Sequence, residues 1–557
     1  MGPVFCRSPL GLTLIGLFTM KRSFFFWGLL ASALVLHGCK GGAEVSNAVT
    51  ITGHLGGAGI SGATVTVGSR SATSDSNGDY SLSIPEAAFS SEMVFSSTGG
   101  SYVDEASGET VTLGAASGLS AYVPANSLSA SATVVNLNSG TTVVYLGAQK
   151  MVEYHAANGH AHTLDDTFTD VSGYFNTAFG YTPDFTVKAV SAASTPASTD
   201  TDAQKLEGLR EAVFGQLAKD LLGTSSSKMD LLVALGSDLG DGTLDGLGES
   251  SALSVGGTTV PTTVQNKWEN SFMTYLGGNT NKSALTNDKI GALPFAKKAT
   301  TSNYLVTYTA GSMAAMQGLT TFELAVTDLS GNAVSGTSVS LTPFMYMSSM
   351  THASPQDGCT LKSGSTNTFT CKVYYLMAGG SGMGYWKLSA KVSKSGATDE
   401  TAVFYPAVGM AMGDTVRVYL QDPNRYTTAT EKRYIFIFKD SATTSSFGVF
   451  LNTKESMMSW PTLKTGTAYT AYASGASTTY TPSTITVEYS KDKTTWSAMT
   501  SASNNGHYTA SGLGLTSGTS TTLYVRVKFD SDTVYATTDG GASSTAYGTF
   551  TVTPSSM

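Results

Sequence analysis

Short segments in which apolar and polar residues alternate recur along most of the chain. Such alternation is typical of strands that bury one face. It predicts strands near the N-terminus at Ala63–Val67 and Tyr80–Ile84. From residue 299 onward it predicts a longer series of strands, at Tyr304–Thr309, Thr321–Val326, Ser338–Leu341, Trp386–Val392, Arg433–Phe438, Ser483–Tyr489, Leu523–Phe529 and Tyr547–Val552.

The part between residues 119 and 298 has a different period. In Asp202–Leu222 the apolar positions follow i, i+3 and i+4 spacing, which places them on one face of a helix. Weaker helical patterns cover Leu164–Phe179 and Lys228–Leu235. Residues 119–298 are therefore predicted to form a helical or α+β module.

The first β region contains Val49–His54, Gly59–Val67 and Ala72–Pro85, with a turn signal at residues 76–78. This order resembles the carboxypeptidase regulatory-like domain, a small transthyretin-like β-sandwich. The resemblance implies a non-catalytic spacer or binding unit at 49–118. Residues 57–62 match G-x-G-x-x-G, but a β-branched strand follows where a nucleotide-binding fingerprint needs a helix, so we interpret them as a turn.

Composition agrees with a mainly β, multidomain chain. Of 557 residues, 13% are charged, 41% hydrophobic and 10% aromatic, with 60 Gly. Low charge with many aromatic residues excludes an ordinary disordered chain, and scarce charge disfavours a coiled coil. We expect two immunoglobulin-like β-sandwiches, at 299–406 and 407–557, after the transthyretin-like and helical modules.

The N-terminus has the pattern of a processing signal. Basic Lys21 and Arg22 precede an apolar run at Phe24–Leu36, which is too short to span a bilayer. The run ends in Leu-His-Gly-Cys, which resembles a bacterial lipobox. The resemblance implies that residues 1–38 are removed and that Cys39 is lipidated, with residues 39–48 as a tether. Met20 is then the expected start; an ordinary signal peptide with a chance Cys is the alternative.

Lipid acylation implies a firm membrane anchor. By resemblance to lipoprotein sorting in Gram-negative bacteria, Lys40 in place of Asp after the Cys favours the outer membrane, on its periplasmic face or at the cell surface. Removing residues 1–38 takes away three basic and no acidic residues, which leaves 29 basic against 40 acidic residues. Because nucleic acids require a basic face, we expect no nucleic-acid partner.

Two further cysteines lie at Cys359 and Cys371. They flank Thr360–Thr370 and are equidistant from its turn residues, as in a cross-strand pair of a hairpin. A disulfide there suits an oxidising compartment, and a thiolate metal pair is the alternative.

Methionine is concentrated in one part of the chain, where 11 of the 19 Met lie between residues 313 and 458. The stretch Phe322–Trp386 resembles a YtkA-like envelope domain, which implies a β-sandwich that handles copper. Thioethers and imidazole suit Cu(I). The candidate ligands are Met345, Met347, Met350, His352 and Met383. The alternative is that these methionines fill a sandwich core.

Two other clusters carry metal-ligating side chains. His155, His160 and His162, followed by two Asp, could bind Zn²⁺ or Cu²⁺, but they fall in a loop without fixed spacing, so solvated histidines are the favoured interpretation. Asp238, Asp241 and Asp245 could bind Ca²⁺, but the spacing misses the EF-hand rule, so a loop after a helix is favoured.

Catalytic motifs are absent from the sequence, and we predict no enzyme. The leading hypothesis is a lipid-anchored envelope protein whose β-sandwiches bind other envelope proteins or surface polymers. A copper-binding role for the Met/His segment is the first alternative. An accessory lipoprotein of an outer-membrane redox complex is the second alternative, and that hypothesis rests on analogy alone.

Overall fold

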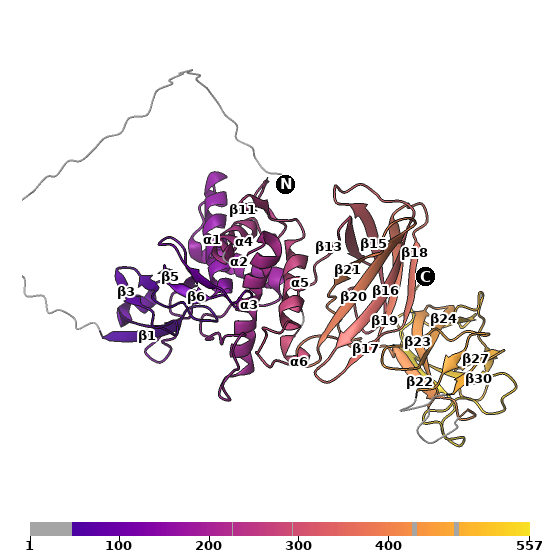
Figure 1. Ribbon diagram of the computed structural model, residues 1–557. Coiled ribbons are helices and arrows are strands. Elements are labelled where there is room, and N and C mark those ends of the chain that lie inside the picture. The colour runs from indigo at the N-terminus through magenta and orange to yellow at the C-terminus, as the bar shows by residue number, and fades with distance from the viewer. Residues whose placement is uncertain (1–46, 225–226, 292, 426–431, 473–477, 557) are drawn as a thin grey trace, which may run out of the picture. The chain divides into compact units, whose positions relative to one another are not determined.

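A computed structural model describes residues 47–224, 227–291, 293–425, 432–472 and 478–556 (Figure 1). The predicted fold class is confirmed, because the chain is mainly β, with many separate antiparallel sheets and a few helices. Asn47–Met557 forms one compact unit. The signal sequence and Cys39 lie outside the described residues.

The first region consists of small antiparallel sheets. β2 and β4 cover the two strands that alternation predicts. β2 lies between β3 and β5 in a sheet that ends with β8, while β1 pairs with β4 and β6 pairs with β7. The strands are β1 (Ala48–His54), β2 (Thr64–Val67), β3 (Arg70–Thr73), β4 (Asp79–Pro85), β5 (Met93–Thr98), β6 (Ser101–Val103), β7 (Thr110–Thr112) and β8 (Ser120–Val123), and a 3-10 helix covers Glu86–Ser90.

The glycine-rich segment 57–62 is a turn that fits tightly against the next turn. Gly59 has a φ of +77°, and a Cβ there would lie 2.1 Å from the carbonyl oxygen of Asn77. Gly78 makes the reciprocal contact, since its Cβ would lie 2.5 Å from the Cα of Gly59. The glycines thus allow two backbones to approach each other.

The helical region contains α1 (Ser139–Ala157), α2 (Leu164–Phe179), α3 (Asp202–Leu222), α4 (Lys228–Leu239), α5 (Val264–Leu276) and α6 (Asn287–Ile290), with two short hairpins formed by β9 (Leu247–Gly248), β10 (Ser251–Ala252), β11 (Ser254–Val255) and β12 (Thr258–Thr259). The bounds of α2 and α3 agree with the sequence prediction. Each begins with a capping box, at Thr163 and Thr201 respectively. α4 continues four residues beyond its predicted end at Leu235.

One hydrophobic core joins the first β region to the helices. It extends from Ile51 to Leu293 and also includes Tyr385 and Tyr405 further along the chain. Trp268 of α5 contacts Phe179, Phe214 and Phe272 within it. The indole ring of Trp268 is 1% exposed. Helix packing therefore depends on this aromatic cluster, together with the apolar face of α3.

The next region is a two-sheet sandwich. A five-stranded sheet has the order β13-β14-β15-β19-β18, and a four-stranded sheet has the order β17-β16-β20-β21. Side chains of both sheets form a separate core. The strands are β13 (Lys298–Thr300), β14 (Tyr304–Ala310), β15 (Gly318–Asp328), β16 (Thr337–Tyr346), β17 (Thr351–Ala353), β18 (Gln356–Leu361), β19 (Thr368–Tyr375), β20 (Tyr385–Lys394) and β21 (Glu400–Phe404).

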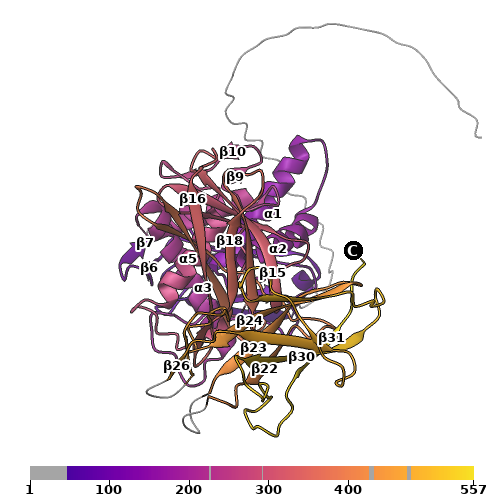
Figure 2. The ribbon, with the colours of Figure 1, turned by 90° about the vertical axis from the view of Figure 1, so that its right-hand side faces the viewer.

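The last region is a second two-sheet sandwich. β22, β23 and β24 lie side by side in one sheet (Figure 2). β29 is at the edge of this sheet, and the other sheet has the order β28-β27-β30-β31. Ile435, Ile437, Val449 and Leu451 point into the core between them. The strands are β22 (Arg417–Gln421), β23 (Tyr434–Ala442), β24 (Ser446–Lys454), β25 (Tyr469–Thr470), β26 (Thr479–Tyr480), β27 (Ile485–Ser490), β28 (Ser497–Ala498), β29 (His507–Ser511), β30 (Thr521–Phe529) and β31 (Gly548–Val552).

The two sandwiches share a small aromatic contact. Tyr374 of β19 stacks on Phe450 of β24 with ring centroids 4.6 Å apart and lies 5.3 Å from Phe438 of β23. The Tyr374 hydroxyl donates a hydrogen bond to Asp440 over 2.8 Å. Part of the outer face of the β22-β23-β24 sheet is therefore covered by the first sandwich.

Candidate functional site

Four of the five predicted copper ligands belong to the β16–β17 hairpin of the first sandwich, and Met383 lies just before β20. Met345 on β16 is the direct partner of His352 on β17, and its other neighbour across the sheet is Trp386. Opposite residues of an antiparallel pair share one face, so these three side chains point the same way. Met345 is fully buried in the sandwich core and His352 is 5% exposed.

The remaining methionines of that set lie at different depths. Met347 and Met383 are partly buried against the core, whereas Met350 at the hairpin turn is 48% exposed. Met383 approaches the hairpin because Gly384, with φ +106°, lies against it: a Cβ there would be 2.0 Å from the carbonyl oxygen of Tyr346. The structure thus places Met345 and His352 together and directs Met350 towards solvent.

The ring of His352 has a defined orientation. Its Nδ1 lies 2.9 Å from the carbonyl oxygen of Ala353, so Nδ1 carries the proton and donates it. Burial lowers the pKa of His352, which keeps the imidazole neutral. A neutral ring with its Nδ1–H bound to a carbonyl has its Nε2 lone pair available as a ligand.

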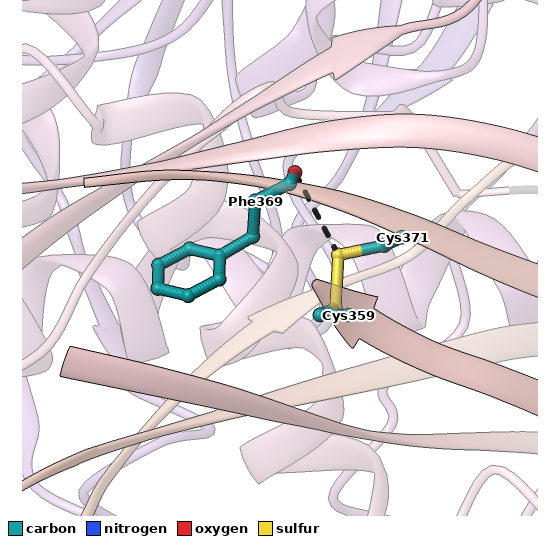
Figure 3. Close-up of a disulfide and its surroundings, with 3 residues drawn as sticks. All are labelled: Cys359, Phe369 and Cys371. Atoms are coloured by element: carbon teal, nitrogen blue, oxygen red, sulfur yellow. Dashed lines mark hydrogen bonds between the residues drawn. A yellow bond between two sulfur atoms is a disulfide. The ribbon is translucent and has the colours of Figure 1, made fainter. Parts of the chain in front are cut away.

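Cys359 and Cys371 are joined by a disulfide between neighbouring strands (Figure 3). They are direct partners in the β18–β19 pair, as in the predicted hairpin. The Sγ atom of Cys371 lies 3.9 Å from the carbonyl oxygen of Phe369, two residues earlier on β19. The disulfide closes the hairpin at the edge of the five-stranded sheet.

The other two clusters do not form metal cages. His155 and His162 lie with ring centroids 4.1 Å apart, while His160 is solvent-exposed. Asp238 is fully buried and accepts the backbone N–H groups of Asp245 and Gly246, which closes the loop after α4. Within the described residues, no group of three or more His, Cys, Asp or Glu side chains is arranged to hold a metal ion.

A cavity of about 640 Å³ lies where β1 and β4 meet the start of α3. Asp79 at its wall accepts hydrogen bonds from Lys188 over 2.6 Å and from His54 over 2.8 Å. Both hydrogen bonds hold the pKa of Asp79 below its usual range, against the opposing effect of burial. Because its charged groups already satisfy one another, this cavity offers few groups to a ligand.

A second surface, on the outer side of the β22-β23-β24 sheet, combines aromatic rings with cations. Alternate residues of β22, β23 and β24 point away from the sandwich core, and they align in rows across the sheet. Gln421, Tyr434 and Lys454 form one row and Tyr419, Phe436 and Asn452 form the next. We call the part of this surface that borders the contact with the first sandwich the aromatic face; it consists of Arg417, Tyr419, Tyr434, Lys454, Trp460 and Tyr472, of which Tyr419 is exposed and the others are half-buried.

Aromatic rings form a continuous layer on the aromatic face. The Tyr419 ring lies 6.1 Å from Tyr434, and Tyr434 lies 6.0 Å from Tyr472. Trp460 packs edge-on against Phe436 at 4.9 Å. Tyr419 is 50% exposed, although large aromatic side chains are usually covered.

Two cations lie among these rings. The Lys454 ammonium is 4.4 Å from the Tyr472 ring centroid, 5.6 Å from Trp460 and 5.9 Å from Tyr434. The Arg417 guanidinium lies 5.9 Å from the Phe436 ring. Neither cation has an ion-pair partner among the described residues. Burial lowers the pKa of both groups.

The nearest acid in the sequence does not neutralise Lys454. Glu455 accepts the backbone N–H of Thr470 over 2.7 Å and the Ser459 hydroxyl over 2.9 Å. The fully buried Asn452, on the same side of the sheet as Phe436, has no hydrogen-bond partner for either side-chain amide atom among the residues that the structure describes. The aromatic face therefore combines flat rings with two positive charges that have no ion-pair partner in the described part of the chain.

Comparison with known proteins assigns no family to this chain, since neither the protein-family models nor the curated proteins gave a match. No helix among the described residues is both long and apolar enough to cross a membrane.

Sequence reasoning missed the aromatic face. Alternation predicts a strand at Arg433–Phe438, but Tyr419, Trp460 and Tyr472 come from other segments. The sequence of β23 alone does contain a signal for this face. Tyr434 and Phe436 alternate with the core residues Ile435 and Ile437, so both faces of the strand carry large apolar side chains. A strand with apolar residues on both faces predicts a second contact surface.

Proposed function

We propose that this chain is a non-enzymatic, lipid-anchored protein of the bacterial outer membrane that binds an anionic cell-surface polysaccharide through the aromatic face. The lipid anchor is supported by the sequence before Cys39, in which a basic pair and an apolar run end in Leu-His-Gly-Cys. The observation that carries the binding role is a pair of cations, Arg417 and Lys454, that have no ion-pair partner among the described residues and lie beside half-buried and exposed aromatic rings.

The chemistry of the face matches such a ligand. The C–H groups of a sugar ring pack on aromatic rings, and Tyr and Trp give large contact areas at low entropic cost. Carboxylate or phosphate groups on the polymer would pair with Arg417 and Lys454, whose charge is incompletely hydrated beside the rings. Arg417 on β22 lies opposite Phe438 of β23, and Lys454 on β24 lies opposite Tyr434 of β23. Phe438 and Tyr434 are four residues apart, so the two cations are separated by about 13 Å along the strand direction. A polymer therefore suits the face better than a single small anion.

Binding to immobilised polygalacturonate tests the proposal, with neutral dextran as the uncharged comparison. We expect the double variant Tyr419→Ala/Lys454→Gln of the mature chain to lose at least tenfold in affinity for polygalacturonate. Binding to dextran should be weak for both proteins. Equal polygalacturonate binding by the wild type and the variant would remove the aromatic face from the proposal.

The chain offers a matched control on its other C-terminal sheet. Lys493 lies 4.9 Å from the Tyr524 ring there, and the nearby Arg526 is paired with Glu488 over 2.7 Å. The variant Tyr524→Ala/Lys493→Gln removes the same side-chain types from a surface on which the neighbouring cation, Arg526, is already paired. Its affinity for polygalacturonate should equal that of the wild type.

The lipid anchor has a separate test. Labelled palmitate should be incorporated into the wild-type chain in a Gram-negative host and not into Cys39→Ala. Equal labelling of the two proteins would contradict the anchor and leave the polysaccharide result unaffected.

Copper binding by the hairpin is the second candidate function. It is favoured by one observation, the cross-strand position of Met345 and His352 with Nδ1–H of His352 bound to Ala353. Cu(I) titration of the mature chain should show weaker binding in Met350→Leu/His352→Ala. Unchanged affinity in that variant would exclude the hairpin as a copper site.

A further inference from the structure

The turn between β6 and β7 docks the first β region on helix α3. The Lys219 ammonium of α3 donates a hydrogen bond to the carbonyl oxygen of Ala106 over 3.1 Å. Gly215 of α3 lets the turn approach closely, because a Cβ there would lie 2.7 Å from Oδ2 of Asp104. Asp104, Glu105 and Ala106 are all buried. Ionisable side chains are therefore enclosed at this contact, where each charge needs a partner.

The hydrogen bonds that Glu105 accepts come from two neutral groups. Its Oε1 accepts the Ser191 hydroxyl over 2.7 Å and the backbone N–H of Ala193 over 3.3 Å. The preceding acid, Asp104, instead accepts the backbone N–H of Ala106 within its own turn over 3.0 Å. Because neither donor to Glu105 carries a charge, an ionised carboxylate would be weakly stabilised in this buried position.

A second acid lies on the other side of the glycine-rich segment 57–62. A Cβ on Gly57 would lie 3.0 Å from Oε2 of Glu105 and 3.2 Å from the Cβ of Glu211 on α3. Gly57 thus fits between two acidic side chains, where a larger residue would hold them further apart. Because like charges in a buried site repel each other, an ionised Glu211 disfavours the ionisation of Glu105.

The buried ammonium of Lys228 is already engaged by Glu211. Its Nζ, at the start of α4, lies 3.8 Å from Oε2 of Glu211 and 4.8 Å from the Tyr102 ring centroid. The titratable and charged groups that face Glu105 and its turn are Lys219, Lys228, Glu211 and Tyr275 from the helices, and Tyr102 and Asp104 from its own hairpin. With Glu105 ionised, three carboxylates would therefore face two ammonium groups.

Burial raises the pKa of Glu105 from 4.5 to about 7, and the Glu211 carboxylate acts in the same direction. The hydrogen bonds from Ser191 and Ala193 and the charge of Lys228 oppose this rise without cancelling it. The docked turn thus holds the Glu105 proton more tightly than an opened turn, in which the side chain is hydrated. The stabilisation from this proton is complete below pH 4.5 and is lost as the pH rises to about 7.

We propose that a proton on Glu105 controls the contact between the first β region and the helices, so that the β6–β7 turn docks firmly on α3 in acid and loosens as the pH rises to neutrality. The glycine-rich segment contributes by placing Glu105 and Glu211 on either side of Gly57. This contact is independent of the aromatic face and of the lipid anchor, so failure of either of those proposals leaves it intact.

Hydrogen–deuterium exchange of the mature chain at pH 5.5 and pH 7.5, corrected for the intrinsic exchange rates of unstructured amides, measures the opening of this contact. For the amides of β6 and β7 we expect the opening equilibrium constant to rise about tenfold or more between the two pH values, because the docked turn loses its proton near pH 7 and the opened turn near pH 4.5. The variant Glu105→Gln retains an acceptor oxygen for Ser191 and Ala193 but cannot ionise. Its rise should be smaller than that of the wild type by about the same factor.

A matched control lies on the same hairpin, because Glu109, just before β7, is exposed. The variant Glu109→Gln also removes one carboxylate and should keep the pH response of the wild type. The wild-type measurement tests the proposal without any variant, since no rise for β6 and β7 between pH 5.5 and pH 7.5 would overturn it. An equal rise in the wild type and Glu105→Gln, or loss of the rise in Glu109→Gln, would overturn it as well.

Discussion

His507 connects the two C-terminal sandwiches through charge. Its Nδ1 lies 3.0 Å from Asp440 of its own sandwich, and its Nε2 lies 3.1 Å from Asp357 of the first sandwich. Burial alone would lower its pKa, but the hydrogen bonds to Asp357 and Asp440 outweigh burial and raise the pKa of His507 to about 9. The ring is therefore protonated at neutral pH and bridges two carboxylates.

The size of the effect follows from the change in pKa. A rise from 6.5 to about 9 corresponds to about 3 kcal/mol for a fully buried group. The side chains of His507, Asp357 and Asp440 are 17%, 30% and 21% exposed, so solvent screening reduces this to roughly 1–2 kcal/mol. Lys372 lies 3.6 Å from Asp357 and competes for that carboxylate, which reduces the stabilisation free energy further.

The sign of the pH dependence follows from proton binding. The folded state holds the His507 proton more tightly than the unfolded state, so the stabilisation is complete below pH 6.5 and is lost as the pH rises through about 9. We expect the unfolding temperature of the mature chain to fall by roughly 1–2 °C more between pH 6 and pH 10 than that of His507→Gln. Calorimetry of both proteins at each pH measures the difference.

The matched control is His155→Gln, which removes a histidine at the end of α1 that lies far from either sandwich in the sequence. Its pH dependence should equal that of the wild type. If His507→Gln and the wild type lose stability in parallel from pH 6 to pH 10, the bridge between the sandwiches contributes nothing and the reasoning fails.

Three further stability predictions follow from burial and covalent linkage. Trp268→Ala should destabilise the chain by about 3–5 kcal/mol in urea unfolding, because its ring fills the centre of the helical core; a loss under about 1 kcal/mol would contradict that packing. The double variant Cys359→Ser/Cys371→Ser should lose roughly 2–3 kcal/mol, and reductant should lower the urea midpoint of the wild type only. Met345→Ala should cost about 2–5 kcal/mol and Met350→Ala much less, because only Met345 is in the core; equal costs would refute this assignment of depths.

The helices show what local sequence could predict. The bounds of α2 and α3 follow from polar residues that begin each helix and from apolar residues on one face. α1 was missed because Gly140, Thr141 and Gly147, which it buries, give no apolar stripe. Those small side chains instead allow close packing, as a Cβ on Gly147 would lie 2.8 Å from Val171. Contacts of that kind depend on the partner helix and are invisible to periodicity.

The candidate sites also divide into features that the sequence predicts and features that depend on how the strands pair. The density of methionine between residues 313 and 458 was evident, and so was the pairing of Cys359 with Cys371. Which methionines are core and which are exposed depends on strand pairing, and Met345 and Met347 could not be separated from the sequence alone. His507 and Asp357 are 150 residues apart in the chain, and only the contact between the sandwiches joins them.

The outer face of the β22-β23-β24 sheet explains why a ligand site belongs on its uncovered part. Where the first sandwich covers the sheet, the outward residues are Phe436, Phe438 and Phe450, which have no polar atom to hydrate. Beyond that contact the outward residues are Tyr419, Tyr434 and Lys454, whose rings and stem are apolar while their tips can stay in water. A surface that served only to pack would continue with Phe, whereas a surface that alternates between water and a polymer needs groups that tolerate both. The change from Phe to Tyr along β23 therefore marks the limit of the contact between the sandwiches and the start of the aromatic face.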